Sequence, residues 1–245
     1  MKGGRLGITP LGVELLDDPA ADPDTVIQSL RNIARSNRWF GGAAAVRHGL
    51  ERVLRGVSRA RPLTLLDLGT GAGDLPQRAV RWARRNGYEL RPVGLELNRT
   101  AAAMALRAGV PCAVACAGAP PVREKSVDLV LVSQVVHHLT DDSTVRLLRT
   151  CDALARVGVV IADLRRGRMA PIAFWFGARA LRFDPSTVAD GITSIRRGYT
   201  PGELRALLAA AGVSARVSRR PGYRLVATWR TTSVPGELDA REERP

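Results

Sequence analysis

Two acidic residues, Asp67 and Glu96, each end a run of apolar residues, and three glycines follow Asp67 at alternate positions: Gly69, Gly71 and Gly73. Apolar runs of this length are typical of strands buried on both faces. Glycine lets the backbone approach a ligand where a Cβ would collide. Open α/β sheets bind ligands at the carboxyl ends of their strands. Because a carboxylate there repels a pyrophosphate and attracts a cation, we expect a positively charged ligand.

Strands and helices must alternate along the chain to position these acids. This alternation predicts an α/β fold, Rossmann-like, with a seven-stranded, mostly parallel sheet and helices on both faces. Arg220-Pro221-Gly222 predicts a tight turn, and hence an antiparallel C-terminal hairpin. The predicted strands are 63–68, 92–97, 111–115, 127–133, 157–163, 213–219 and 223–229, and the predicted helices are 75–86, 98–108, 143–155 and 201–211.

A helical segment precedes the sheet. Helical spacing runs from Asp24 to about Leu54, and Gly41-Gly42 divides it into two helices. We expect three parts: an N-terminal arm and helical lid over 1–58, a ligand-binding domain over 59–230, and a disordered tail over 231–245.

The segment that contains Asp67, Leu-Leu-Asp-Leu-Gly-Thr-Gly-Ala-Gly, resembles the first motif of the class I S-adenosylmethionine-dependent methyltransferases. The resemblance implies that Glu96 accepts hydrogen bonds from both ribose hydroxyls and that Asp67 faces the methionine ammonium. A Rossmann-like domain with another ligand, or with none, is the alternative. The implied cofactor-binding residues are Asp67, Gly69, Thr70, Gly71, Gly73, Glu96, Leu97, Cys116, Ala117, Ser133 and Gln134.

The sequence departs from this family at the adenine end of the site. Most relatives place an aspartate before the fourth strand, whereas the segment around Cys116 and Ala117 has no acid. We therefore expect backbone groups or a water molecule to recognise the adenine. Cys116 is either a soft contact to the adenine or a small core residue.

Two histidines, His137 and His138, follow the predicted fourth strand. Relatives often have a His-His-Leu sequence here, which the resemblance places beside the transferred methyl group. Histidine can remove a proton near neutral pH. We expect His137 to face the substrate as the candidate base and His138 to pack inward.

Aromatic residues gather in two places that flank the expected site. Trp39 and Phe40 stand at the break between the N-terminal helices, where they either cap and pack on the core or form part of a lid. The insertion 164–199 forms either a substrate lid or an ordinary extra helix. Its apolar character predicts a phenol, quinol or polyketide acceptor. The candidate substrate residues are Trp39, Phe40, Arg165, Phe174, Trp175, Arg196 and Tyr199.

Composition narrows the class of protein. The formal net charge of +14 admits nucleic acid or anionic membrane as partners, but the arginines are scattered and the aromatic content is 4%. We therefore expect a small-molecule substrate and no nucleic acid. No stretch is long enough to span a bilayer, no signal peptide is evident, and the three cysteines lack metal-site spacing, so we expect a cytoplasmic protein.

The layout from about residue 25 to 230 is similar to the UbiE/MenG-like branch of small bacterial methyltransferases. The branch uses one scaffold for carbon and oxygen methylation. We expect methyl transfer without a metal, because Asp163 alone provides too few oxygen ligands for a hard cation such as Mg²⁺. We also expect oxygen methylation rather than carbon methylation. An RNA or protein methyltransferase and a catalytically silent scaffold that binds S-adenosylmethionine are the alternatives, and the oligomeric state is left open.

Overall fold

The computed structural model describes residues 21–231, so the predicted arm before residue 21 and tail after residue 231 lie outside the described part. Seven strands form one sheet in the order β3-β2-β1-β4-β5-β7-β6. All neighbours are parallel except β7, which is antiparallel to both β5 and β6. The predicted fold class is confirmed. The strands are β1 Leu63–Leu68, β2 Leu90–Glu96, β3 Cys112–Val114, β4 Val127–Ser133, β5 Ala155–Leu164, β6 Arg216–Arg220 and β7 Arg224–Arg230.

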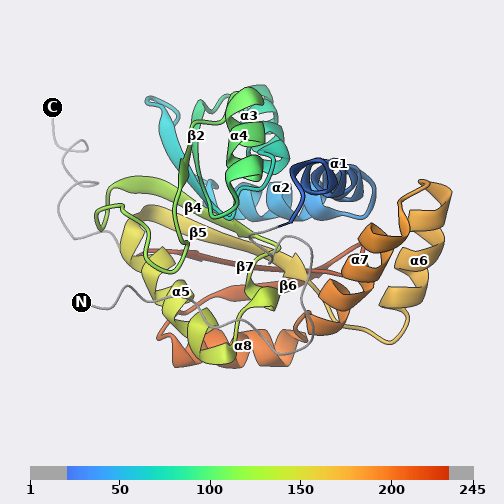
Figure 1. The fold of residues 1–245 in the computed structure, drawn as a ribbon. Helices are drawn as coiled ribbons and strands as arrows, with labels where there is room; N and C mark the ends of the chain where they lie inside the picture. The colour runs from blue at the N-terminus through green and yellow to red at the C-terminus, as the bar shows by residue number, and fades with distance from the viewer. Residues whose placement is uncertain (1–20, 232–245) are drawn as a thin grey trace, which may run out of the picture.

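Helices cover both faces of the sheet (Figure 1). Helices α2, α3 and α4 lie on one face and α5 and α8 on the other, while α6 and α7 project beyond one end of the sheet. The helices are α1 Pro23–Trp39, α2 Gly42–Val53, α3 Asp74–Arg85, α4 Arg99–Arg107, α5 Asp141–Leu154, α6 Ala170–Ala180, α7 Pro185–Arg197 and α8 Pro201–Ala210, with a short 3-10 helix, η2, at Val136–His138. Among residues 21–231, none of the helices has the length and apolar character needed to cross a bilayer.

The core consists of two apolar layers, one on each face of the sheet. Leu65 belongs to the layer under α2 and α3, and its neighbour Leu66 belongs to the layer against α5 and α8. This alternation follows from the twofold repeat of side chains along a strand. Every residue of β4 is buried, as the apolar run predicts for a central strand.

The predicted start of the sixth strand at residue 213 is wrong. Residues 213–215 belong to no strand, because Val213 closes the end of α8: its N–H donates to the Leu208 carbonyl, and the Gly212 N–H donates to Ala209. This pair of bonds satisfies helix carbonyls that would otherwise be unpaired. Strand β6 therefore begins only at Arg216.

The break between α1 and α2 is fixed to the β6–β7 turn by contact between backbones. A Cβ at Gly41 would lie 2.4 Å from the carbonyl oxygen of Pro221, and one at Gly222 would lie 2.3 Å from that of Phe40. Only glycine permits this approach. The contact brings the N-terminal helices to the carboxyl ends of β4 and β5.

Candidate active site

Asp67 is buried at the carboxyl end of β1, beside Gly94 of β2. Its Oδ2 accepts a hydrogen bond from the Thr70 hydroxyl at 2.8 Å, whereas its Oδ1 has no partner within residues 21–231. Burial raises the pKa of Asp67 to about 7, and the hydrogen bond from Thr70 offsets only part of the rise. The negative charges of Asp74 and Glu96 raise this pKa further. A buried carboxylate oxygen without a partner fits a ligand that brings a cation.

Glu96 holds the glycine loop against the end of β2. Its Oε2 accepts from the backbone N–H of Gly71 at 2.8 Å, and its Oε1 accepts from that of Leu97 at 2.8 Å. Gly71 has a φ of 55°, and Gly69 and Gly73 also lie in the left-handed region that glycine tolerates. The turn that follows β1 therefore depends on its glycines.

Helix α1 lies directly over this loop. Leu30 comes within 3.6 Å of the position that a Cβ on Gly71 would take, and it packs in a small apolar cluster with Val26 and Ala101. Helix α1 thus covers part of the glycine loop. The action of the N-terminal helices as a lid remains a prediction.

The polar groups of Ser133 and Gln134 both have protein partners. The Ser133 hydroxyl donates to the carbonyl of Ala162 at 3.2 Å. Gln134 donates to Asn37 Oδ1 at 2.6 Å and accepts from Arg224 Nη1 at 2.8 Å. Gln134 therefore links α1 to β7, and a role for either residue in cofactor binding remains a prediction.

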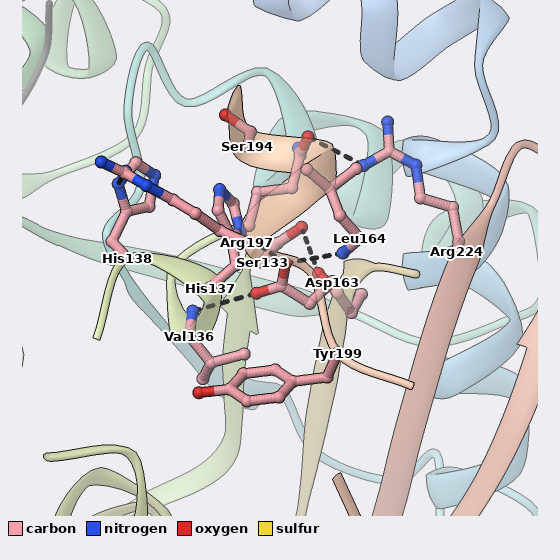
Figure 2. Close-up of polar contacts among 12 residues, drawn as sticks. Ser133, Val136, His137, His138, Asp163, Leu164, Ser194, Arg197, Tyr199 and Arg224 are labelled. Carbon is pink, nitrogen blue, oxygen red and sulfur yellow. Dashed lines mark hydrogen bonds and ion pairs between the residues drawn. The ribbon is translucent and has the colours of Figure 1, made fainter. Parts of the chain in front are cut away.

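His137 and Asp163 form a buried pair, shown in Figure 2. His137 Nδ1 lies 2.6 Å from Asp163 Oδ1, and both side chains are 2% exposed. Two backbone groups fix the carboxylate: the N–H of Val136 donates to Oδ2 at 2.9 Å, and that of Leu164 donates to Oδ1 at 2.6 Å. The pair connects η2, after β4, to the end of β5.

The electrostatics of this pair define the histidine tautomer. Burial alone raises the pKa of Asp163, but the interaction with the His137 ring and the hydrogen bond from the Leu164 N–H outweigh it, so this pKa lies below its usual value. Because an ionised carboxylate only accepts hydrogen bonds, His137 carries its proton on Nδ1. Its Nε2 is buried and has no partner within the described residues. In neutral His137 this nitrogen holds the lone pair that can accept a proton.

His137 is buried more deeply than His138, so the expected inward packing of His138 is wrong, while the substrate-facing role of His137 remains a prediction. His138 is half-buried, whereas His137 is turned toward β5 by the pairing with Asp163. Their ring centroids lie 4.2 Å apart, and His138 Nδ1 lies 3.2 Å from Nη1 of Arg197. Arg196, which we predicted near the substrate, is exposed. Consecutive residues of a helix point about 100° apart, so Arg197 takes the place beside the histidines.

Tyr199 and Arg165 are joined by an isolated bridge at the end of β5. The Tyr199 hydroxyl lies 3.3 Å from both Thr144 and Asp141, and burial raises its pKa to about 12. The Arg165 guanidinium stacks on the Tyr223 ring at 4.9 Å. Both residues are engaged with the protein, so their action on a substrate remains a prediction.

Aromatic side chains connect the N-terminal helices to the insertion. Phe40 packs edge-on against Phe174 of α6, with ring centroids 5.6 Å apart, and against Phe183 at 6.4 Å. Trp39 and Trp175 do not join this cluster, because they are 61% and 43% exposed. Of the predicted aromatic substrate residues, the structure brings Phe40 and Phe174 together and leaves the two tryptophans at the surface.

The residues predicted at the adenine end flank the ends of β2 and β3. Leu97 is 69% exposed, while Cys116 and Ala117 are half-buried in the loop after β3. Ala117 packs against the core layer of α5 and α8. These positions leave the Leu97 side chain available to a planar apolar group.

Comparison with known proteins identifies the domain. Residues 66–162 match a family model described as a methyltransferase domain, and this segment includes Asp67, the glycine loop, Glu96 and His137. The chain carries a class I S-adenosylmethionine-dependent methyltransferase domain. S-adenosylmethionine is its cofactor, and the unpartnered Oδ1 of Asp67 fits the ammonium of that molecule. None of the curated protein sequences matches the chain.

Solved structures share the fold at low sequence identity. Human N-acetylserotonin methyltransferase has a TM-score of 0.58 and 14% identity over 86% of this chain, which spans 56% of that enzyme's length. A methyltransferase from Aquifex aeolicus has a TM-score of 0.55 and 17% identity, with 85% of this chain and 98% of that one covered. The O-methyltransferase NcsB1 of neocarzinostatin biosynthesis has a TM-score of 0.58 and 19% identity, with 91% and 62% covered.

Four residues of the site were not predicted from the sequence: Asn37, Asp163 in its role as partner of His137, Arg197 and Arg224. Like Asp67, Asp163 is an acid near the carboxyl end of an apolar strand, and this pattern could have predicted it as a site residue. The two arginines and Asn37 carry no such signal. Their burial and partners depend on how α1, α7 and β7 meet the sheet.

Proposed function

We propose that this protein methylates a hydroxyl oxygen on a small aromatic or hydrophobic acceptor, with His137 as the general base. The observation that carries the proposal is the 2.6 Å contact between His137 Nδ1 and Asp163, which leaves Nε2 without a partner among the described residues. When bound, S-adenosylmethionine supplies a methyl group on a sulfonium, whose leaving group is a neutral thioether.

The proposed roles of His137 and Asp163 follow from their geometry. Nε2 of His137 takes the proton of the acceptor hydroxyl as the oxygen becomes nucleophilic. The imidazolium that results is stabilised by ionised Asp163, which the backbone N–H groups of Val136 and Leu164 hold in place. Both residues are buried, so the proton transfer takes place away from bulk water.

The cofactor contacts that we propose use the two acidic strand ends. Asp67 binds the methionine ammonium through Oδ1, and Glu96 accepts hydrogen bonds from the ribose diol. Leu97 packs on the adenine, with Cys116 and Ala117 at its edge. The exposure of Leu97 supports this assignment, because an adenine ring would cover it.

The proposed acceptor is aromatic or lipid-like. Phe40 and Phe174 form an apolar wall between the N-terminal helices and the 164–199 insertion, which we propose to act as the substrate lid. The solved structure of NcsB1 contains 2-hydroxy-5-methyl naphthoic acid, so this fold accommodates an acceptor of that kind. Placement of the chain in the UbiE/MenG-like branch is part of the same proposal.

Turnover with a panel of phenols and hydroxynaphthalenes, read as methylated product by mass spectrometry, tests the proposal. His137→Gln should lower turnover about a hundredfold or more and leave binding of S-adenosylhomocysteine unchanged. His48→Gln is the matched control, because His48 lies on α2 with Ser218 as its contact. If the His137 variant methylates every acceptor at the wild-type rate, His137 is not the base.

A further inference from the structure

Arg224, the first residue of β7, is a buried guanidinium without an acidic partner among the described residues. It is 3% exposed, its Nε donates to the Phe40 carbonyl at 3.0 Å, and its Nη1 donates to Gln134 Oε1 at 2.8 Å. Both acceptors are neutral oxygens. Within residues 21–231 no carboxylate forms an ion pair with Arg224, and its Nη2 donates no hydrogen bond.

The acids nearest to Arg224 are already committed to other groups. Asp163 is close enough to favour the charged form of Arg224, yet it accepts hydrogen bonds from His137, Val136 and Leu164. Asp74 is reached only through two neutral amides: Gln134 donates to Asn37, which donates to Asp74 at 3.2 Å. The described part of the protein therefore leaves the Arg224 charge without a counter-ion of its own. Burial of such a charge is costly unless an anion joins it.

Arg224 also stands where three parts of the proposed acceptor site meet. Gln134 follows β4 and precedes His137 by three residues, and Phe40 packs on Phe174 of the insertion. In Figure 2 the guanidinium lies across the carboxyl ends of β4 and β5 from the histidines. An anion placed there would lie in the same site as the proposed base.

We propose that Arg224 binds a carboxylate of a ligand in this site. A planar guanidinium matches a carboxylate through parallel hydrogen bonds, for which the unbonded Nη2 supplies one donor. The carboxylate belongs either to the acceptor, which is then a hydroxylated aromatic acid, or to the methionine end of the cofactor. This inference rests on the proposed function for the location of the acceptor, although binding of the carboxylate does not require turnover.

Calorimetry separates the two sources of the carboxylate. One arm titrates hydroxynaphthoate and its carboxamide into protein saturated with S-adenosylhomocysteine. The other arm titrates S-adenosylhomocysteine and its decarboxylated analogue into the free protein. In the wild-type protein we expect at least about tenfold tighter binding of the carboxylate member of one pair. Equal affinities within both pairs would overturn the proposal.

Variants then assign the effect to Arg224. Arg224→Gln should abolish the preference for the carboxylate member, and Arg224→Lys should retain part of it. Arg205→Gln on the exposed face of α8 is the control and should behave as wild type. A preference that survives in Arg224→Gln would assign the carboxylate to another residue and refute the proposal.

If Arg224→Gln does not fold, equal affinities in the wild-type protein still overturn the proposal, and Arg224→Lys still tests whether a preference depends on Arg224. These binding measurements are independent of the proposed function, because they do not require methyl transfer. If the protein forms no methylated product but still binds the carboxylate ligand more tightly, the proposed methylation is wrong and the assignment of Arg224 stands.

Discussion

Lowering the pH should weaken the binding of S-adenosylhomocysteine through the protonation of Asp67. In the free protein, burial raises the pKa of Asp67 to about 7. If the ligand ammonium lies on Oδ1, its positive charge favours the ionised carboxylate and lowers this pKa well below that value. Binding must therefore release the proton that Asp67 carries in the free protein.

The magnitude follows from that pKa. Asp67 is protonated in nearly all free molecules at about pH 5.5 and in about three quarters of them at about pH 6.5. The affinity should be about eightfold weaker at the lower pH, and close to one proton should be released per ligand bound. Over this range the amino group of the ligand stays protonated, so the ligand itself does not contribute to the change in affinity.

Isothermal titration calorimetry in buffers of different ionisation enthalpy measures both quantities. Asp67→Asn is the control, because it keeps the shape and the bond from Thr70 but cannot ionise; it should bind more weakly and release no such proton. An affinity in the wild-type protein that does not change between these pH values would refute the assignment of Oδ1 to the ammonium.

Four further predictions follow from the same geometry. Glu96→Ala should weaken the binding of S-adenosylhomocysteine by a few kcal/mol, because charge-assisted hydrogen bonds to the ribose are lost, and unchanged affinity by calorimetry would contradict that role. Asp163→Asn should lower turnover about a hundredfold or more, because the introduced amide can donate to Nδ1 and favour the wrong tautomer of His137; a variant that keeps wild-type turnover would show that Asp163 does not position the base. The ligand-free Asp67→Asn protein should gain stability over wild type as the pH rises from about 4 to about 7, because over that window Asp67 is ionised in the unfolded wild-type chain but still protonated in the fold, so the wild-type fold loses stability; thermal unfolding at about pH 4 and about pH 8 should show a difference of a few kcal/mol only at the higher pH. Strong chelation should leave methyl transfer unchanged, and inhibition that magnesium reverses would show that a metal takes part.

The sheet and its acidic strand ends could be predicted because their signals are local. An apolar run that closes with Asp67 or Glu96 specifies a buried strand with a carboxylate at its end, whatever the rest of the chain does. The capping box of Thr200 and Glu203 likewise fixes the start of α8 within one turn. The error at residue 213 arose where a helix terminus and a strand compete for the same backbone N–H groups.

The arrangement of side chains around His137 could not be predicted in this way. Which of two adjacent histidines turns inward depends on the position of Asp163 on the neighbouring strand, and the choice between Arg196 and Arg197 depends on the rotation of α7 about its axis. The surroundings of Arg224 could not be predicted either, because its neutral partners come from the end of α1 and the loop after β4, which meet β7 only in the fold. Such contacts join residues far apart in the sequence.

A crystal structure of the protein with S-adenosylhomocysteine tests the central claim most directly. We expect the amino group of the ligand within hydrogen-bond distance of Asp67 Oδ1 and the ribose hydroxyls on Glu96, with the sulfur facing the side of the site that holds His137. A ligand bound away from both carboxylates, or a site in which Asp67 Oδ1 stays without a partner, would contradict the account.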